Sequence, residues 1–118
     1  MDSELVKLIL PKGLLNYFEL KKIKPQEEHL EIYLQEKNIL PEEFKSPKFT
    51  SKGFYDEIKV QDFPLRGKGV FLFIKRRRWL NEVTGEIVHR NWDLVAKGTR
   101  KTQEFASFLK VISGCQAS

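Results

Sequence analysis

The sequence is poor in the residue types that build disulfide frameworks and metal sites. It contains one cysteine, Cys115, and two histidines, His29 and His89. A single cysteine permits no disulfide within the chain and no zinc site based on cysteine pairs. Two histidines far apart in a sequence are more often structural or surface residues than metal ligands. We therefore expect neither a bound metal nor another cofactor.

Long apolar runs and secretion signals are also missing. The most apolar run, residues 70–74, is far too short to cross a bilayer. The first ten residues, MDSELVKLIL, carry two acids ahead of their apolar stretch and do not resemble a signal peptide. Together with the single cysteine, these absences favour a cytoplasmic protein that does not associate with membranes.

Arginine is absent from the first half of the chain. Residues 1–62 contain 10 lysines and 12 acidic residues, whereas residues 63–118 contain 5 lysines, 6 arginines and only 4 acidic residues. Arginine binds phosphates and base edges through its planar guanidinium group. The basic second half therefore indicates a polyanionic partner, and the alternative is a solvated basic face without a partner.

The length and composition predict one folded domain. The 118 residues are 41% hydrophobic and 31% charged, which is typical of a globular protein with a modest core. We expect a single domain over residues 1–118, with a helix and hairpin in residues 1–44 and a basic, ribbon-like β subregion plus a helix in residues 54–112. Residues 45–53 are rich in Ser, Lys, Pro and Gly and are predicted to form a loop or a boundary.

Hydrophobic periodicity predicts the order of the elements. Helices are expected at residues 4–10 and 99–112, with one helical turn within residues 38–44. Strands are expected at residues 17–23, 29–36, 55–63, 70–80 and 87–92, the first two forming an antiparallel hairpin. The fold class is therefore α+β: an antiparallel meander of about five strands with a short N-terminal helix and a C-terminal helix.

The strongest candidate for binding chemistry is the run from Lys75 to Trp79 at the end of the predicted strand 70–80. Alternation places Lys75, Arg77 and Trp79 on the face of Phe71 and Phe73, and the other two arginines on the opposite face. Adjacent cations on both faces require either internal acids or bound phosphates. Trp79 and Trp92 are suited to base stacking, but a tryptophan at a strand end is more often part of the core.

Two glycine-containing basic segments are further candidates. Cations at the predicted helix start, residues 97–102, oppose the helix dipole unless an anion binds there. The segment Arg66-Gly67-Lys68-Gly69 precedes a strand, which favours a basic hairpin turn over a nucleotide-binding loop. The candidate DNA-binding residues are Arg66, Lys68, Arg76, Arg77, Arg78, Arg90, Lys97, Arg100 and Lys101.

Catalytic patterns are not evident. Asp56 and Asp62 lie at even spacing, as expected for the solvent face of an edge strand. The sequence has only two histidines, and its single cysteine lies near the end, so it does not suggest a catalytic nucleophile paired with a base. We therefore expect a protein that is not an enzyme.

Several segments resemble one family. The runs QDFPLRGKGVFLFIKRRRW and LVAKGTRKTQEFASFLK, together with KGLLNYFELKKI, YLQEKNILPEEF and SKGFYDE, resemble the N-terminal region of bacterial insertion-sequence DDE transposases. In that family a zinc-ribbon-like β module ends in an arginine-rich strand. The zinc cysteines of that module are absent here, since Leu80-Asn81-Glu82-Val83 follows Trp79 where a pair would begin.

The resemblance implies a role in transposition. It implies binding to double-stranded DNA at the transposon ends beside a separate or downstream catalytic portion, and hence a location at the nucleoid. It supplies neither a metal ligand nor the DDE triad for this chain. Two alternatives remain: a protein-interaction module that docks onto an acidic partner such as the transposase catalytic subunit, and a small RNA-binding β domain.

Overall fold

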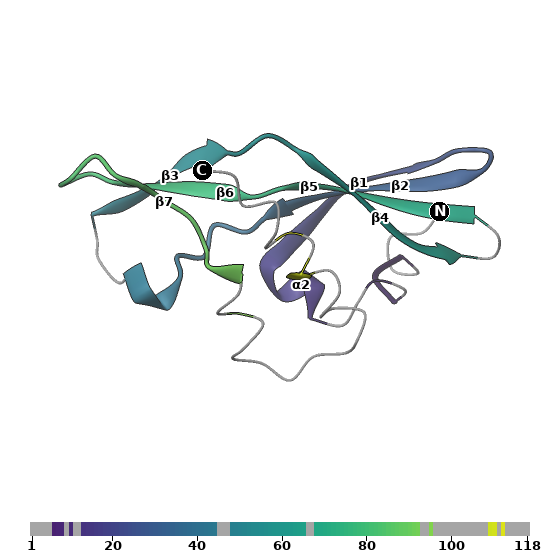
Figure 1. Ribbon diagram of the computed structural model, residues 1–118, viewed down its shortest axis with the longest axis horizontal. Helices are drawn as coiled ribbons and strands as arrows, with labels where there is room; N and C mark the ends of the chain where they lie inside the picture. The colour runs from purple at the N-terminus through teal and green to yellow at the C-terminus, as the bar shows by residue number, and fades with distance from the viewer. Residues whose placement is uncertain are drawn as a thin grey trace.

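A computed structural model describes residues 6–8, 10, 13–44, 48–65, 68–92, 95, 109–110 and 112, with backbone only at residues 61–65 and 68. Over these residues the chain is α+β, with seven strands in two sheets and few short helical segments (Figure 1). The predicted fold class is thereby confirmed at the level of α+β.

The strands divide into a larger and a smaller sheet. The four-stranded sheet has the order β1 (Phe18–Pro25), β2 (His29–Glu36), β5 (Lys68–Lys75) and β4 (Ile58–Leu65). The three-stranded sheet has the order β3 (Phe49–Phe54), β6 (Arg77–Asn81) and β7 (Ile87–Val88). The helical elements with described bounds are α2 (Leu14–Tyr17) and the 3-10 helix η1 (Glu42–Phe44).

The predicted N-terminal hairpin is confirmed. Strands β1 and β2 pair antiparallel, with a register shift between Leu20 and Lys22. Along β2 the residues alternate between half-buried and buried, because every second side chain points into the core. The alternation that is visible in the sequence therefore reports the true faces of this strand.

The prediction of an antiparallel meander is wrong, because β5 lies between β2 and β4 and runs parallel to β2. Leu30 lies opposite Val70, and Ile32 lies opposite Leu72, so the two most apolar strands form the centre of the sheet. All four of these side chains are buried. Central positions give these strands apolar neighbours on both sides, whereas the more polar β1 and β4 form the edges.

The single strand expected at residues 70–80 is divided at Arg76. Strand β5 ends at Lys75 in the four-stranded sheet, and β6 begins at Arg77 in the three-stranded sheet. The alternation shifts at this point: Ile74 and Arg76 are buried, and the next buried residue is Trp79. The expectation that Trp79 shares the face of Phe71 and Phe73 is therefore wrong.

Other element boundaries also differ from expectation. The predicted loop at residues 45–53 contains the start of β3, and the strand expected at residues 55–63 begins at Ile58. Of residues 87–92 only Ile87 and Val88 form a strand. Helical residues are described at 6–8 within the expected first helix and at 109, 110 and 112 within the expected last one. The other residues of the expected C-terminal helix, 99–108 and 111, lie outside the described part.

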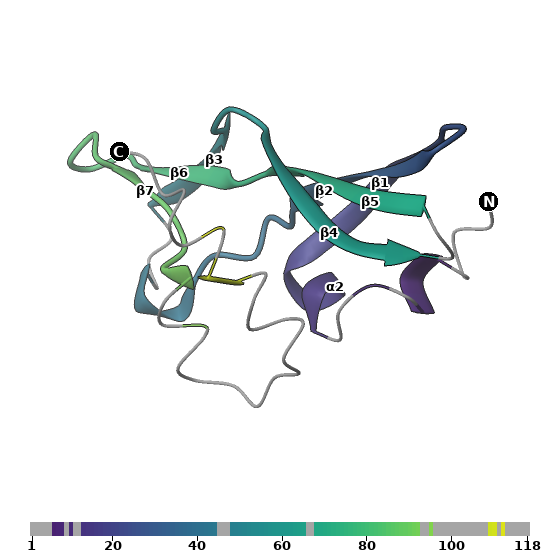
Figure 2. The same ribbon diagram turned by 45° about the vertical axis from the view of Figure 1, so that its right-hand side comes forward.

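The main core lies on one side of the four-stranded sheet. It joins buried strand residues to Val6, Leu14, Leu109 and Ile112 from the helical segments, and Trp92 packs with them. Figures 1 and 2 show α2 and η1 on this same side of the sheets. Trp79 is buried as well, so both tryptophans are enclosed, as expected from the sequence.

Among the described helices, none has the length and apolar character needed to cross a membrane.

Candidate nucleic-acid interface

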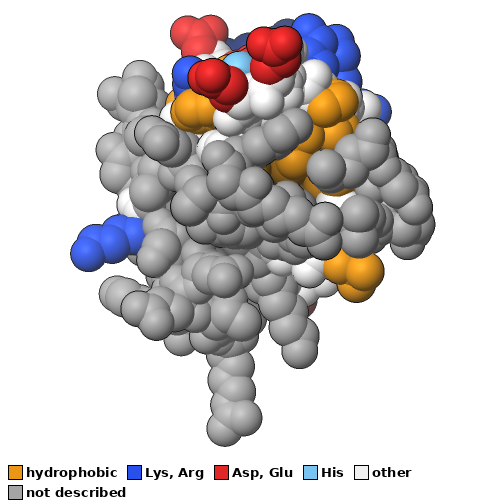
Figure 3. Space-filling model, turned by 90° about the vertical axis from the view of Figure 1, so that its right-hand side faces the viewer, with side chains coloured by type: hydrophobic (Ala, Val, Ile, Leu, Met, Phe, Trp, Pro, Cys, Tyr) orange, Lys and Arg blue, Asp and Glu red, His pale blue; other side chains and the backbone are white. Residues whose placement is uncertain are grey.

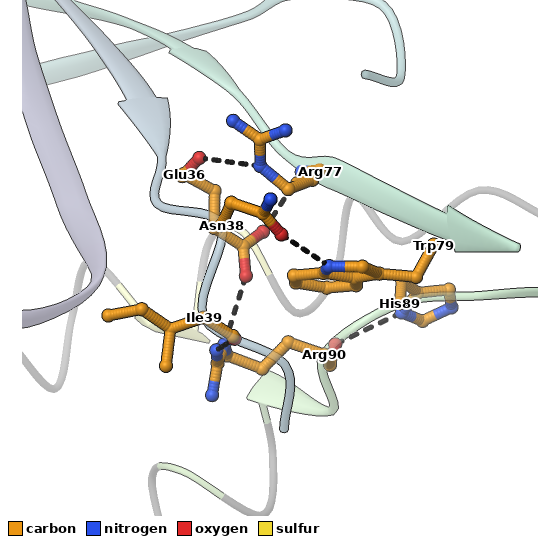
Figure 4. A network of polar contacts seen from close by, with 7 residues as sticks. All are labelled: Glu36, Asn38, Ile39, Arg77, Trp79, His89 and Arg90. Atoms are coloured by element: carbon orange, nitrogen blue, oxygen red, sulfur yellow. Dashed lines mark hydrogen bonds and ion pairs between the residues drawn. The ribbon is translucent and has the colours of Figure 1, made fainter. Parts of the chain in front are cut away.

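The two sheets meet at Glu36, the last residue of β2. Its side chain is only 1% exposed. One carboxylate oxygen accepts the backbone N–H of Arg77 at 3.0 Å, and the other accepts Nε of Arg90 at 2.9 Å (Figure 4). The Nε of Arg77 also donates to the backbone carbonyl of Glu36 at 3.1 Å. Glu36 therefore connects β2 to the first residue of β6 and to the segment that follows β7.

Burial raises the pKa of the Glu36 carboxyl above its ordinary value, because the charged form loses hydration. The hydrogen bonds from Arg77 and Arg90 act in the opposite direction and offset only part of this effect. Asn38 extends the same network by accepting the indole N–H of Trp79 at 3.0 Å (Figure 4). The network thus joins both sheets around the buried carboxylate of Glu36.

Arg77 and Arg90, two of the predicted DNA-binding residues, are bound largely within the fold. Besides Glu36, Arg77 donates to the hydroxyl of Ser51, and its guanidinium carbon lies 4.6 Å from the centre of the Phe54 ring. Arg90 donates to the carbonyl of Ile39 and lies over the rings of Tyr17 and Trp92 at 5.1 and 5.8 Å. These contacts give both side chains a structural role.

Arg76 and Arg78 have a different environment. Their guanidinium carbons lie 5.3 and 5.7 Å from the centre of the Tyr55 ring. The Nε atoms of both are buried without a hydrogen-bond partner in the described part of the chain. Arg78 donates to the carbonyl of Lys52 at 3.2 Å. Within the described residues no acidic side chain forms an ion pair with either arginine.

The other predicted binding residues fall where little is described. Arg66, Lys97, Arg100 and Lys101 lie outside the described residues. Lys68 is the first residue of β5, and only its backbone is described. The structure therefore brings together Arg76, Arg77, Arg78 and Arg90 around the junction between the sheets.

A second surface was not singled out from the sequence. On the side of the four-stranded sheet opposite the core, Tyr33 stacks on Phe73 with ring centres 4.8 Å apart and an interplanar angle of 12°. The edge of His29 meets the ring of Phe71, with centres 5.2 Å apart. We call this surface the open face, and it consists of His29, Glu31, Tyr33, Phe71, Phe73 and the lysines at positions 22, 24, 59 and 75.

Lysines surround the rings of the open face. The ammonium of Lys59 lies 4.3 Å from the centre of the Phe71 ring, and those of Lys22 and Lys24 each lie 5.8 Å from that of Tyr33. Figure 3 shows Lys, Arg, Asp, Glu and His side chains gathered along the upper edge of the molecule in an end-on view. The surface therefore combines aromatic rings with positive charge.

Glu31 fixes the rings beside it. It accepts the Tyr33 hydroxyl at 3.0 Å and contacts Nε2 of His29 at 3.0 Å. The hydrogen bond with His29, followed by that with Tyr33, lowers the pKa of the Glu31 carboxyl. The pKa of Tyr33 is raised, first by desolvation and then by the same hydrogen bond. The acid is thus held ionised at the centre of the open face.

The aromatic pairing could not be located without the strand order. The sequence places Phe71 and Phe73 on one face of their strand and Tyr33 on the polar face of another. Only the parallel pairing of β2 with β5, which sets Tyr33 opposite Phe73, brings the rings together. The signal present in the sequence was an aromatic residue on each non-core face.

The described residues suggest no metal centre. Among them, no group of three or more His, Cys, Asp or Glu side chains is arranged to hold a metal ion. His29 lies on the open face, whereas His89 contacts the backbone carbonyl of Arg90 and the ring of Tyr55.

Comparisons with protein-family models, curated proteins and solved structures found no match to this chain.

The ion pair between Glu36 and Arg90 generates a stability prediction. Replacing Arg90 with Gln leaves a buried carboxylate without its cation and should lower the free energy of unfolding by about 3 kcal/mol or more. Glu36→Gln should also be destabilising, because it removes the carboxylate that forms the ion pair with Arg90. The double variant should lose less than the sum of the two single variants. Urea unfolding of all four proteins measures this coupling, and strictly additive losses would contradict it.

The raised pKa of Glu36 predicts how stability depends on pH. Below the ordinary value of 4.5 the carboxyl is protonated in both the folded and unfolded states. As the pH rises above 4.5 the unfolded state releases its proton first, so this group lowers the free energy of unfolding. The difference in stability between the wild type and Glu36→Gln should therefore fall with rising pH. Unfolding at a series of pH values tests this, and a difference that increases would contradict the assignment.

Proposed function

We propose that this protein is a nucleic-acid-binding module and that Arg76 and Arg78 provide phosphate contacts. The observation that carries the proposal is the environment of Arg76. Arginine is rarely buried unless it is paired, because removing its charge from water is costly. Arg76 is 5% exposed, yet no described residue forms a hydrogen bond or an ion pair with its guanidinium group.

The local charge supports a phosphate rather than an internal partner. Glu36 is the only buried acid among the described residues, and it is already bound to Arg77 and Arg90. Arg76 and Arg78 add two further cations at the same junction. A phosphate group matches the planar donor arrangement of a guanidinium and would supply the missing negative charge.

The resemblance to insertion-sequence transposases gives the proposal a specific form. In that form the nucleic acid is the duplex DNA of the transposon ends, and a transposase catalytic portion acts beside this chain. The chain would then contribute recognition without catalysis. An acidic protein partner is the second candidate, because carboxylates also fit the guanidinium fork of the two arginines.

A salt titration tests the phosphate contacts. Arg76→Gln/Arg78→Gln should weaken binding to both duplex DNA and a single-stranded oligonucleotide. The slope of log affinity against log salt should shrink by roughly 0.9 per lost contact on the duplex and 0.7 on the single strand. Because Arg76 is buried against Tyr55, its replacement should also lower the free energy of unfolding, and a thermal melt establishes that the variant is still folded.

The control is Lys7→Gln/Lys110→Gln, which removes the same charge from two exposed residues. It should leave the salt slope close to that of the wild type. If Arg76→Gln/Arg78→Gln binds both nucleic acids as the wild type does, the assigned contacts are wrong. If the wild type binds polyglutamate and neither nucleic acid, the acidic-partner alternative replaces the proposal.

A further inference from the structure

The open face has the composition of a base-stacking surface rather than of an ordinary solvent-facing sheet. Its centre holds three aromatic rings and a histidine on the two neighbouring central strands. All four side chains are only partly buried. The helical segments that contribute to the main core contact the opposite side of this sheet. Aromatic pairs across neighbouring strands stabilise a sheet by their own contacts. A purely structural role for these rings would not require lysines around them.

The charges on this face follow a definite arrangement. Lys22 and Lys24 lie on edge strand β1, and Lys59 lies on the opposite edge strand, β4. Glu31, the only acid on the two central strands of the open face among the described side chains, lies between His29 and Tyr33. Acids also lie near the margins, because Glu19 on β1 is opposite Gln35 and the charge of Glu57 acts on Tyr33. Among these groups, the lysines at positions 22, 24 and 59 would attract the phosphates of a strand whose bases lie over the rings.

The lysines already occupy the positions that bases would take. Lys59 rests on Phe71, and Lys22 and Lys24 rest on Tyr33. Each of these lysines is exposed and flexible enough to move from a ring to a phosphate. A base can then stack on the vacated ring, and every base has a π-face suited to this contact.

From this arrangement we infer that the open face binds unpaired bases of single-stranded nucleic acid. The inference rests on the proposed nucleic-acid function and names the class of ligand. Bases within a duplex are stacked on one another and cannot reach the rings, so a duplex would contact only the lysines. Strand β5 carries Phe71, Phe73 and Lys75 on the open face, whereas the next residue, Arg76, follows Ile74 on the buried face. The stacking contacts and the phosphate contacts are therefore separate and can be tested separately.

The test compares oligo(dT) with an abasic oligonucleotide that has the same number of phosphates. The wild type should bind oligo(dT) more tightly, by at least about fivefold for each stacked base. Phe71→Leu/Phe73→Leu, which keeps apolar side chains but removes two of the three rings, should lose most of this preference. Phe71→Tyr/Phe73→Tyr, which keeps both rings, should retain it. A thermal melt establishes that each variant is folded.

The matched control is Phe44→Leu/Phe49→Leu, which removes an aromatic pair that is 5.5 Å apart and outside the open face. It should keep the preference for oligo(dT). If the wild type binds both ligands equally and with the salt dependence expected of phosphate contacts, the stacking inference is overturned while the proposed function stands. If the wild type binds no nucleic acid at all, the proposed function fails, and the inference fails with it.

Discussion

The buried carboxylate of Glu36 is the contact on which the arrangement of the two sheets depends. Placing an ionised group in a protein interior costs several kcal/mol unless cations and hydrogen bonds replace its hydration. The backbone N–H of Arg77, the first residue of β6, donates a hydrogen bond to Glu36, and the guanidinium of Arg90, after β7, supplies the cation. The three-stranded sheet is thereby fixed to the end of β2, and the chain can pass from β5 in the four-stranded sheet directly to β6 in the three-stranded sheet.

This connection divides the arginines of the junction into two groups. Arg90 forms an ion pair with Glu36, and Arg77 donates its backbone N–H to the same carboxylate and its Nε to the Glu36 carbonyl, so both residues hold the sheets together. Arg76 and Arg78 lie against Tyr55 instead, without an acidic partner among the described side chains. The uncompensated charge lies next to Lys75, where the open face ends. Arg76 follows Ile74 on the buried face, so this positive charge comes directly after the open face along the chain without being part of it.

Alternation in the sequence predicted the β1–β2 hairpin, because both its strands and its turn are encoded locally. It did not predict that β2 lies beside β5, because a period of two specifies faces and not partners. The division at Arg76 was missed because a continuous run of apolar and basic residues gives no sign of a change of sheet. Glu36 offered an unused signal: it follows Leu30, Ile32 and Leu34 on the core face, and an acid at such a position requires a buried cation. The sequence correctly indicated a concentration of arginine, but a count of arginines cannot separate those bound to Glu36 from those left for a ligand.

The most direct measurement of the central claim is the set of intermolecular nuclear Overhauser effects in a complex of the labelled protein with oligo(dT). Base stacking on the open face predicts contacts from thymine protons to the ring protons of Tyr33, Phe71 and Phe73, and from sugar protons to the side chains of Lys22, Lys24 and Lys59. Contacts confined to the opposite side of the sheet, around α2 and Leu109, would contradict it, as would a saturated complex in which the three rings show no contact with the oligonucleotide.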